Sequence, residues 1–413
     1  MADSEKKYKI FLSAAEPSAD LHCANLINTL KEKNQNIQFL GVGGPKMQQA
    51  GCRLLEVTTK KAVMSYNAFT QISRFYKLIK KIQAYLAEQK PDVVIVCDSP
   101  AFNFHIAKAA RAVNAKTVFY VAPQLWAWAP WRIKKLRNCC DKLCCILPFE
   151  QDWFSSRNVN TTFVGNPLLD EVTDDLENNI KDYSGFDPQH GKLALMPGSR
   201  LAEIETIWKH MQTVAKSLRR KYPRLEITTV AVDEEKKKIL KNLHTIDFQT
   251  SYTIGNVYET ARQSDFALVT SGSATLQVAA AGCPMAIMYQ SSPFLWHAVG
   301  KWLIRTKHLS LVNILADSEL VPEFMPYFKS TEPIEKAAMS LYTDPGKLAE
   351  LSRQLIELVK PLKQNAAENT ADIVSEFLES CPKPNSKGQY ELWQKENETA
   401  KKSPPKTPAD PEI

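Results

Sequence analysis

Two short loops in the second half of the chain have the residue types of a phosphate site. They read Pro197-Gly198-Ser199-Arg200 and Thr270-Ser271-Gly272-Ser273-Ala274-Thr275. Each follows an apolar run typical of a strand, at 193–196 and 266–269, and precedes a helical pattern. A helix start offers unpaired backbone N–H groups and a positive dipole end, which favour phosphate. Glycine allows close approach, hydroxyls add donors, and Arg200 can bind two phosphate oxygens at once.

We expect these two loops to act together. They lie roughly seventy residues apart, and ligands of open parallel sheets bind outside the carboxyl ends of the strands. The pair therefore predicts a diphosphate held at the carboxyl edge of one parallel sheet. Ordinary strand-to-helix turns are the alternative for either loop alone.

Asp98 is the candidate general base. It follows the apolar run 93–97 and precedes Ser99 and Pro100, so it should lie at the carboxyl edge of a sheet in the first half of the chain. A carboxylate there could take a proton from an attacking hydroxyl. A helix cap for the segment that starts near Phe102 is the alternative.

The loop after the first strand-like run carries three further polar residues, Glu16, Ser18 and Asp20, which are candidates for the acceptor side of the site. Asp20 or Ser18 fits the N-cap of the next helix, whereas Glu16 is harder to explain as a cap. A glycine turn at 41–44 lacks the full dinucleotide fingerprint, so NAD is not expected.

Strand and helix patterns alternate along the chain, which favours a parallel α/β fold. The expected strands are 9–13, 38–42, 93–97, 117–121, 143–147, 162–164, 193–196, 226–232, 247–250, 266–269 and 285–289. The expected helices include 21–32, 102–113, 133–138 and 347–378. Two doubly wound, Rossmann-like domains that face each other across a cleft are the simplest assembly.

A polar, acidic stretch at 165–191 marks the expected domain boundary. We predict a first domain over 1–172, a second over 173–345, a helical segment over 346–380 and a disordered tail over 381–413. The tail is rich in proline, lysine, glutamate and asparagine and has little apolar content.

Bulk properties exclude several classes of protein. The 413 residues are 44% hydrophobic and 23% charged, with a formal charge of +7, which is ordinary for a soluble protein. Nucleic-acid motifs are missing, so no nucleic-acid partner is expected. Neither a signal segment nor a run near the roughly 18 apolar residues of a membrane span occurs, which predicts a cytoplasmic protein unless it sits on a membrane surface.

Four of the nine cysteines fall in 139–145, where we expect small buried residues rather than metal ligands.

A basic, amphipathic stretch at 60–85 is the most distinctive surface feature. No acidic residue occurs from Val57 to Ala87, and aromatic and aliphatic residues recur at helical spacing. Such a helix can lie on an anionic membrane, and a helix packed on the sheet with a solvated basic face is the alternative. The residues expected to face the membrane are Phe69, Ile72, Phe75, Tyr76, Lys77, Lys80 and Lys81.

Three tryptophans within 126–131 indicate a cleft wall or a lipid-contacting lip. The segment 294–311 is a second apolar, basic stretch.

Taken together, these segments resemble the lipid-A-disaccharide synthases, which are inverting glycosyltransferases of the GT-B fold. The resemblance covers about 9–378. It rests on seven motifs in the same order: 16–20, 97–103, 125–128, 147–150, 195–200, 271–276 and 310–316.

The resemblance implies a reaction that joins two acylated glucosamine units. The 6-hydroxyl of 2,3-diacylglucosamine 1-phosphate attacks a UDP-2,3-diacylglucosamine donor, which gives a β-1,6 disaccharide and UDP. By the same resemblance, Asp98 matches the essential aspartate, Arg200 the phosphate-loop arginine and Asn313 an active-site asparagine. The residues implied to bind UDP are Gly198, Ser199, Arg200, Ser271, Gly272, Ser273, Thr275 and Gln277. Such enzymes balance the charge on UDP with helix dipoles and basic residues, so no metal or other cofactor is implied.

The family's lipid substrates imply a role for the basic stretch at 60–85 in membrane contact, since their acyl chains must be drawn partly out of a bilayer. The implied place is the inner face of the bacterial inner membrane, with the final helical segment packed back on the first domain. The oligomeric state stays open, with a homodimer among the alternatives.

The chain departs from the family pattern at four positions. Ala15 and Ala19 stand where glycines are usual, Asn166 replaces a common histidine, and Gln277 replaces the glutamate expected to bind the donor ribose. The loss of charge at residue 277 would cost about 1 kcal/mol in donor binding. Gln277 and the altered loop around Ala19 leave a catalytically degenerate, ligand-binding relative as one rival function. The other rival is a UDP-sugar transferase of the GT-B fold or a UDP-N-acetylglucosamine epimerase that acts on soluble substrates.

Overall fold

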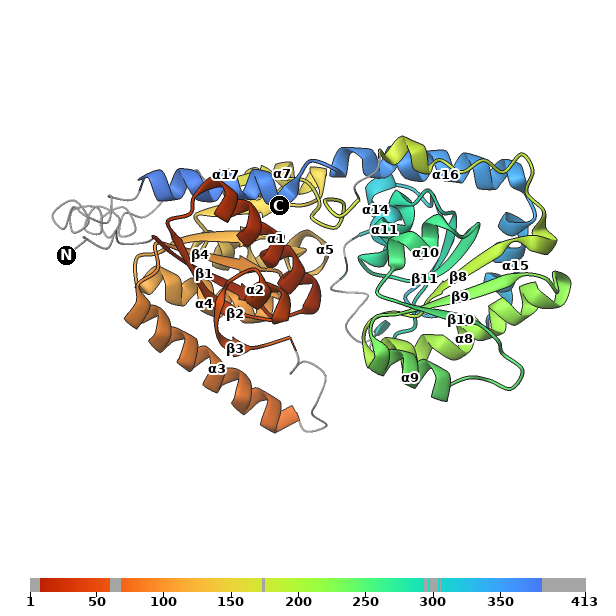
Figure 1. The fold of residues 1–413 in the computed structure, drawn as a ribbon, viewed down its shortest axis with the longest axis horizontal. Helices are drawn as coiled ribbons and strands as arrows, with labels where there is room; N and C mark the ends of the chain where they lie inside the picture. Colours follow the sequence, from red (N-terminus) through yellow and green to blue (C-terminus); the bar gives the residue numbers. More distant parts are fainter. Residues whose placement is uncertain are drawn as a thin grey trace. The chain divides into compact units, whose positions relative to one another are not determined.

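The computed structural model describes residues 8–59, 68–172, 175–292, 296–297, 304 and 306–380, with the side chains of 68–72 set aside. The chain divides into two compact units. The first comprises Met1–Leu125, Pro130–Gly165 and Asn365–Ile413, and the second comprises Trp126–Ala129 and Asn166–Gln364. Each unit is a parallel sheet with helices on both faces (Figure 1).

The first unit contains a seven-stranded sheet in the order β3-β2-β1-β4-β5-β6-β7. Its strands are β1 (Tyr8–Ala14), β2 (Ile37–Gly43), β3 (Arg53–Val57), β4 (Val93–Cys97), β5 (Lys116–Tyr120), β6 (Lys142–Cys145) and β7 (Thr161–Phe163). Its helices are α1 (Pro17–Lys33), α2 (Pro45–Gln49), α3 (Ala68–Gln89), α4 (Pro100–Ala112), α6 (Ile133–Arg137), α7 (Pro148–Ser155) and α17 (Ala366–Ser380). Of helix α5 (Leu125–Trp128), the first residue belongs to the first unit and the other three to the second.

Strand β1 shows why helices cover both faces of this sheet. Successive side chains of a strand point to opposite faces. Ile10 and Leu12 join the buried cluster beneath α1 and α17, whereas the ring of Phe11 lies 6.3 Å from that of Tyr85 on α3. A strand that is buried on both faces reads as a continuous apolar run, as β4 does.

The second unit contains a six-stranded sheet in the order β10-β9-β8-β11-β12-β13. Its strands are β8 (Lys192–Met196), β9 (Glu226–Ala231), β10 (Ser251–Ile254), β11 (Phe266–Thr270), β12 (Met285–Met288) and β13 (Glu323–Phe324). Its helices are α8 (Leu201–Lys221), α9 (Glu234–Asn242), α10 (Val257–Arg262), α11 (Ala274–Ala280), α14 (Leu311–Ala316), α15 (Glu332–Tyr342) and α16 (Pro345–Val359).

Both sheets have a point where the strand order reverses, between β1 and β4 in the first unit and between β8 and β11 in the second. In open α/β sheets, ligands bind outside the carboxyl ends of the strands at such a point. Glu16 and Asp98 follow the two strands of the first reversal point, and the loops at 197–200 and 270–275 follow those of the second. The topology therefore brings the candidate residues to the right edge of each sheet.

Three sequence predictions of secondary structure differ from the structure. The strand expected at 247–250 begins at Ser251, and the short strands β3 and β13 were not predicted. The helix expected at 347–378 is two helices, α16 and α17, which belong to different units. Pro361 and the positive φ of Asn365 interrupt the helix between them. The expected tail lies outside the described residues.

Candidate active site

The two phosphate-loop candidates leave the second sheet side by side. Strands β8 and β11 pair in parallel, with Met196 opposite Val269, so the chain enters both loops at the same level of the sheet. Long helix α8 follows the first loop and short helix α11 the second. The structure thus brings these predicted residues together within one unit.

An internal carboxylate organises the first loop. Gly198 has a φ of +100°, and a Cβ there would lie 2.6 Å from Oε2 of Glu203. That oxygen accepts hydrogen bonds from the backbone N–H groups of Ser199 and Arg200, both at 3.2 Å, while Arg200 Nη1 lies 3.3 Å from Glu203 Oε1. Glu203 therefore already holds the backbone donors that the sequence assigned to a phosphate. The side chain of Arg200 is 67% exposed.

The second loop has an exposed tip and a buried base. Gly272 and Ser273 are exposed and Ser271 is half-buried, and a Cβ on Gly272 would meet no atom within 4 Å. Thr275 is fully buried, and its hydroxyl donates to the carbonyl of Gly272 at 2.8 Å. The threonine thus braces the loop, and the tip residues are the ones open to a ligand. Gln277 is half-buried on α11.

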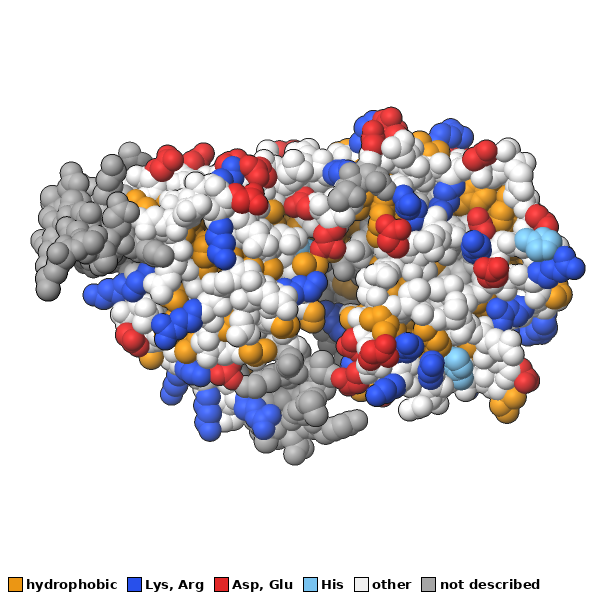
Figure 2. Space-filling view, viewed as in Figure 1, with side chains coloured by type: hydrophobic (Ala, Val, Ile, Leu, Met, Phe, Trp, Pro, Cys, Tyr) orange, Lys and Arg blue, Asp and Glu red, His pale blue; other side chains and the backbone are white. Residues whose placement is uncertain are grey.

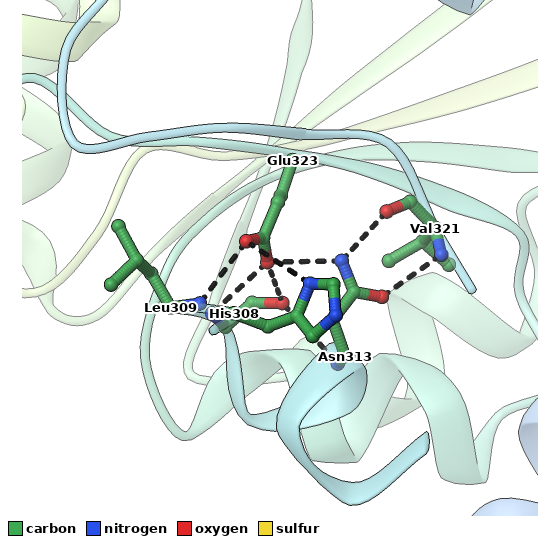
Figure 3. A network of polar contacts seen from close by, with 6 residues as sticks. His308, Leu309, Asn313, Val321 and Glu323 are labelled. Atoms are coloured by element: carbon green, nitrogen blue, oxygen red, sulfur yellow. Dashed lines mark hydrogen bonds and ion pairs between the residues drawn. The ribbon is translucent and has the colours of Figure 1, made fainter. Parts of the chain in front are cut away.

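Asn313 lies in a buried polar network rather than on an open surface (Figure 3). Its amide Nδ2 donates to Val321 O and to Glu323 Oε2, each at 2.9 Å, and its Oδ1 accepts the N–H of Val321 at 3.0 Å. Glu323 also accepts the N–H groups of Leu309 and Ser310, both at 3.1 Å. Asn313 therefore ties helix α14 to strand β13, and Glu323 of that strand also binds the backbone at residues 309 and 310.

Asp98 occupies an unusual turn at the end of β4. Its φ is +52° and that of the next residue, Ser99, is +43°. Left-handed conformations of residues other than glycine cost about 1–3 kcal/mol each and cluster at functional sites. Ser99 is the N-cap residue of α4, so the alternative interpretation of Asp98 as that cap is wrong. The Asp98 side chain is half-buried at the edge where Glu16, the N-cap residue of α1, also lies.

The prediction that Asp20 or Ser18 caps α1 is wrong. Helix α1 begins at Pro17, so both residues lie inside its first turns. The buried Asp20 carboxylate instead accepts the N–H groups of Gly44, Lys46 and Met47, at 2.8, 3.1 and 3.0 Å. Asp20 therefore caps α2 although it lies on α1. The sequence gives no signal of this contact, because Asp20 and its partners are 24 to 27 residues apart.

We expect Asp20→Ala to lower the free energy of unfolding of the full chain by about 2–4 kcal/mol, because three backbone donors lose their acceptor. Urea denaturation followed by circular dichroism measures this change. Ser18→Ala, at an exposed position of the same helix, is the matched control and should change stability by less than about 0.5 kcal/mol. Equal stability of the two variants would contradict the capping role.

Helix α3 carries the predicted basic, amphipathic face. Tyr76, Lys77, Lys80 and Lys81 are exposed, and Phe75 is half-buried with its ring 5.6 Å from that of Phe102 on α4. Residues 60–67 and the side chains of Phe69 and Ile72 lie outside the described residues, as does most of 294–305. Figure 2 shows Lys and Arg side chains gathered along the side of the first unit where α3 runs in Figure 1.

The basic face extends from α3 to α4 and α6. His105 on α4 contacts the ring of Phe75, and burial together with Lys135 and Lys108 lowers the pKa of His105. Lys135 on α6 lies 4.9 Å from the ring centre of Phe104. No acidic residue occurs from 99 to 140, the stretch that holds α4 and α6. On α3, Lys81 pairs with Glu56 at 2.8 Å, which leaves Lys77 and Lys80 as the other exposed lysines of that face. The tryptophans at 126–131 range from buried Trp126 to Trp131, which is exposed beside α6.

Of the four cysteines at 139–145, Cys139, Cys144 and Cys145 are buried, as predicted. Seven of the eight in the described part of the chain are buried, and Cys140 is half-buried. Burial raises the pKa of Cys139 to about 11 and those of Cys52 and Cys144 to about 12, so these thiols stay protonated at neutral pH. Over the described residues, no three His, Cys, Asp or Glu side chains are grouped as metal ligands, and no helix there has the length and apolar character to cross a membrane.

Sequence reasoning missed the residues that hold the candidate residues in place. Glu203 could have been found, because it stands three residues after the N-cap residue Arg200, which is the spacing of a capping box. Glu323 had no such signal, since its partners lie 10 to 14 residues away in the chain. Asn103 is the last residue of the motif at 97–103, but nothing in the sequence indicated its hydrogen bond to Ser13, 90 residues away and near Asp98.

Comparison with known proteins gives a family and a fold. A family model described as lipid-A-disaccharide synthetase matches residues 10–377. A Legionella pneumophila protein named lipid-A-disaccharide synthase 1 is 31% identical over 367 residues, which cover 87% of this chain and 94% of that protein.

Two solved structures resemble the chain in fold. The S. aureus MnaA–UDP complex has a TM-score of 0.61 at 16% identity and covers 92% of this chain and 100% of its own. Acinetobacter baumannii MurG has a TM-score of 0.56 at 13% identity and covers 89% of this chain and 99% of its own. At these identities the likeness concerns the fold alone, and it confirms the predicted class, two parallel α/β sheets of the GT-B kind.

Proposed function

The chain belongs to the lipid-A-disaccharide synthetase family, glycosyltransferases of lipid A biosynthesis, and from this premise we propose how its two units divide the reaction. The donor is UDP-2,3-diacylglucosamine and the acceptor is 2,3-diacylglucosamine 1-phosphate. The second unit binds the donor, and the first supplies the base and meets the membrane that holds both lipids. The products are a β-1,6-linked disaccharide 1-phosphate and UDP.

The position of two loops at one reversal point carries the donor assignment. The diphosphate lies against the exposed tip Gly272-Ser273 and the guanidinium of Arg200, which can form two charge-assisted hydrogen bonds. Ser271 and the half-buried Gln277 lie on the same loop and helix, within reach of the rest of the nucleotide. Thr275 and Glu203 hold the two loops through internal hydrogen bonds, and Asn313 holds helix α14 to strand β13 in the same unit.

Asp98 acts as the general base. Its carboxylate takes the proton of the acceptor 6-hydroxyl while that oxygen attacks the anomeric carbon of the donor, and the bond from that carbon to the diphosphate breaks. Attack from the face opposite the leaving group inverts the configuration. The negative charge that develops on UDP is stabilised by Arg200 and by the backbone N–H groups of the second loop.

A turnover assay with the purified chain and both acylated sugars tests this function. We expect UDP and disaccharide 1-phosphate in equal amounts, as measured by mass spectrometry. A chain that binds UDP but forms no disaccharide would overturn the proposal in favour of a degenerate relative. If the chain instead inverts the configuration at one carbon of the sugar ring of a soluble UDP-sugar, the epimerase function would be favoured.

We further propose that the basic face of α3, α4 and α6 rests on the cytoplasmic side of the bacterial inner membrane. Each lysine near an anionic surface contributes about 1 kcal/mol to binding. Exposed Tyr76 fits the interfacial region, where amphipathic aromatic rings are enriched. Acyl chains drawn partly from the bilayer could then reach the adjacent site.

Charge reversal tests the membrane proposal. We expect Lys77→Glu with Lys80→Glu to weaken binding to vesicles that contain phosphatidylglycerol by at least about tenfold, because two attractions become repulsions. Flotation on a sucrose gradient measures the bound fraction. Arg220→Glu with Lys238→Glu is the matched control, with the same change in net charge at exposed positions of the second unit. Equal losses for both variants would argue for a non-specific effect of net charge.

A further inference from the structure

The backbone at the end of β4 adopts a conformation that the sequence does not favour. Asp98 and Ser99 are consecutive, neither is glycine, and both have positive φ angles, +52° and +43°. A Cβ crowds the neighbouring carbonyl in this region, so such residues persist only where the surroundings hold them. Some other part of the fold must therefore stabilise this turn.

The side chain of Asn103 holds it. Asn103 lies in the second turn of α4 and is fully buried. Its Nδ2 donates to two successive backbone carbonyls, that of Cys97 at 2.9 Å and that of Asp98 at 2.6 Å. Both acceptors precede the helix, so the amide does not cap α4 but binds the two peptide groups on either side of the Asp98 Cα.

Ser13 fixes the orientation of that amide. The Ser13 hydroxyl donates to Asn103 Oδ1 at 2.7 Å, and both side chains are fully buried. An amide has donors on one side and an acceptor on the other, so a hydroxyl that donates to the oxygen keeps the Nδ2 group toward the two carbonyls. Ser13 lies on β1, next to β4, which ties the turn to the centre of the sheet.

We propose that Asn103, oriented by Ser13, is a positioning residue for the transfer reaction. It holds the left-handed turn that directs the Asp98 carboxylate, so that the base meets the acceptor hydroxyl at a fixed angle and distance. This inference rests on the proposed role of Asp98 as the base. A general base must lie within hydrogen-bond reach of its proton, and a displacement of about 1 Å costs on the order of 100-fold in rate.

Asn103→Leu tests the proposal, because leucine has nearly the shape of asparagine and no donors. We expect kcat to fall about 100-fold, with the KM for the UDP-sugar within about twofold of its original value because that site lies in the other unit. Ser13→Ala leaves the two Nδ2 hydrogen bonds possible but removes the hydrogen bond that fixes the orientation of the Asn103 amide. Its kcat should therefore fall less, by about three- to tenfold.

Gln212→Met is the matched control. Gln212 is a fully buried amide on α8, which donates to Leu243 O at 3.1 Å and accepts the N–H of Thr245 at 2.7 Å. Its replacement removes a buried amide, as Asn103→Leu does, and should lower the midpoint of thermal unfolding by a similar amount. We expect kcat of this variant to stay within about twofold of the unmodified chain.

A double variant separates positioning from general destabilisation. If Asn103 acts through Asp98, Asn103→Leu should reduce the residual rate of an Asp98→Asn chain by less than about twofold. A full 100-fold further loss would assign Asn103 a purely structural role. Should Asn103→Leu fail to fold, Ser13→Ala decides: a folded Ser13→Ala variant with unchanged kcat overturns the inference.

The outcomes also distinguish this inference from the proposed function. If Asp98→Asn keeps its activity, the assignment of the base fails. If Asp98→Asn is inactive while folded Asn103→Leu keeps its original kcat, the base stands and the positioning role of Asn103 is overturned.

Discussion

Replacement of Asp98 by asparagine is expected to lower kcat by about 1,000-fold, the order that a positioned general base contributes. The amide has the shape of the carboxylate but cannot take the proton of the acceptor hydroxyl. UDP release under saturating substrates measures the rate. Calorimetry should show unchanged affinity for UDP, because the nucleotide is assigned to the other unit.

Asp152→Asn is the control for this prediction. Asp152 is an exposed carboxylate on α7 of the same unit, so its replacement makes the same chemical change away from the proposed base. We expect its kcat to stay within about twofold. An Asp98→Asn enzyme that turns over at the original rate would exclude Asp98 as the base, whatever the outcome at Asp152.

The second large effect is expected at Arg200. Arg200→Ala should weaken UDP binding by about 10- to 100-fold, since hydrogen bonds to charged groups contribute about 1.5–3 kcal/mol. Isothermal titration calorimetry measures the affinity. Arg262→Ala is the matched control, because Arg262 also pairs with a glutamate three residues away, with Nε 3.5 Å from Glu259. Its removal should leave UDP affinity unchanged.

Glu203 makes the Arg200 prediction sharper. Its carboxylate lies 3.3 Å from the Arg200 guanidinium and so competes with an incoming phosphate. Glu203→Gln keeps an acceptor for the N–H groups of Ser199 and Arg200 but removes the competing charge. We expect UDP to bind about three- to tenfold more tightly to this variant, the reverse of the effect at Arg200. Equal losses in both variants would mean that the pair maintains the loop without contacting phosphate.

The parts of the fold that depend on local sequence could be predicted. Buried parallel strands such as β4 and β11 are unbroken apolar runs, and the polar residue that follows each run must lie at the carboxyl edge. For that reason the sequence alone predicts that the 270–275 loop and Asp98 lie at the carboxyl edge of a sheet, as they do. The edge strands β3 and β13 were missed because they are short and half-exposed, which leaves no clear pattern.

The roles of individual side chains were harder to predict, because they depend on distant partners. Asp20 looked like a cap of its own helix, yet its carboxylate binds a loop 24 residues away. Asn313 matched an active-site motif, yet its amide is bonded to Val321 and Glu323 inside the unit. Sequence identifies which residue types stand near a site, and tertiary hydrogen bonds decide which of them are open to a ligand.

A crystal structure of the Asp98→Asn chain with donor and acceptor bound would test most directly whether the second unit binds the donor and the first supplies the base. The variant should bind both substrates without reacting. We expect the diphosphate against Arg200 and the Gly272-Ser273 tip, with the acceptor 6-hydroxyl about 3 Å from the side chain of residue 98. A diphosphate bound to the first unit, or an acceptor hydroxyl far from residue 98, would contradict the account.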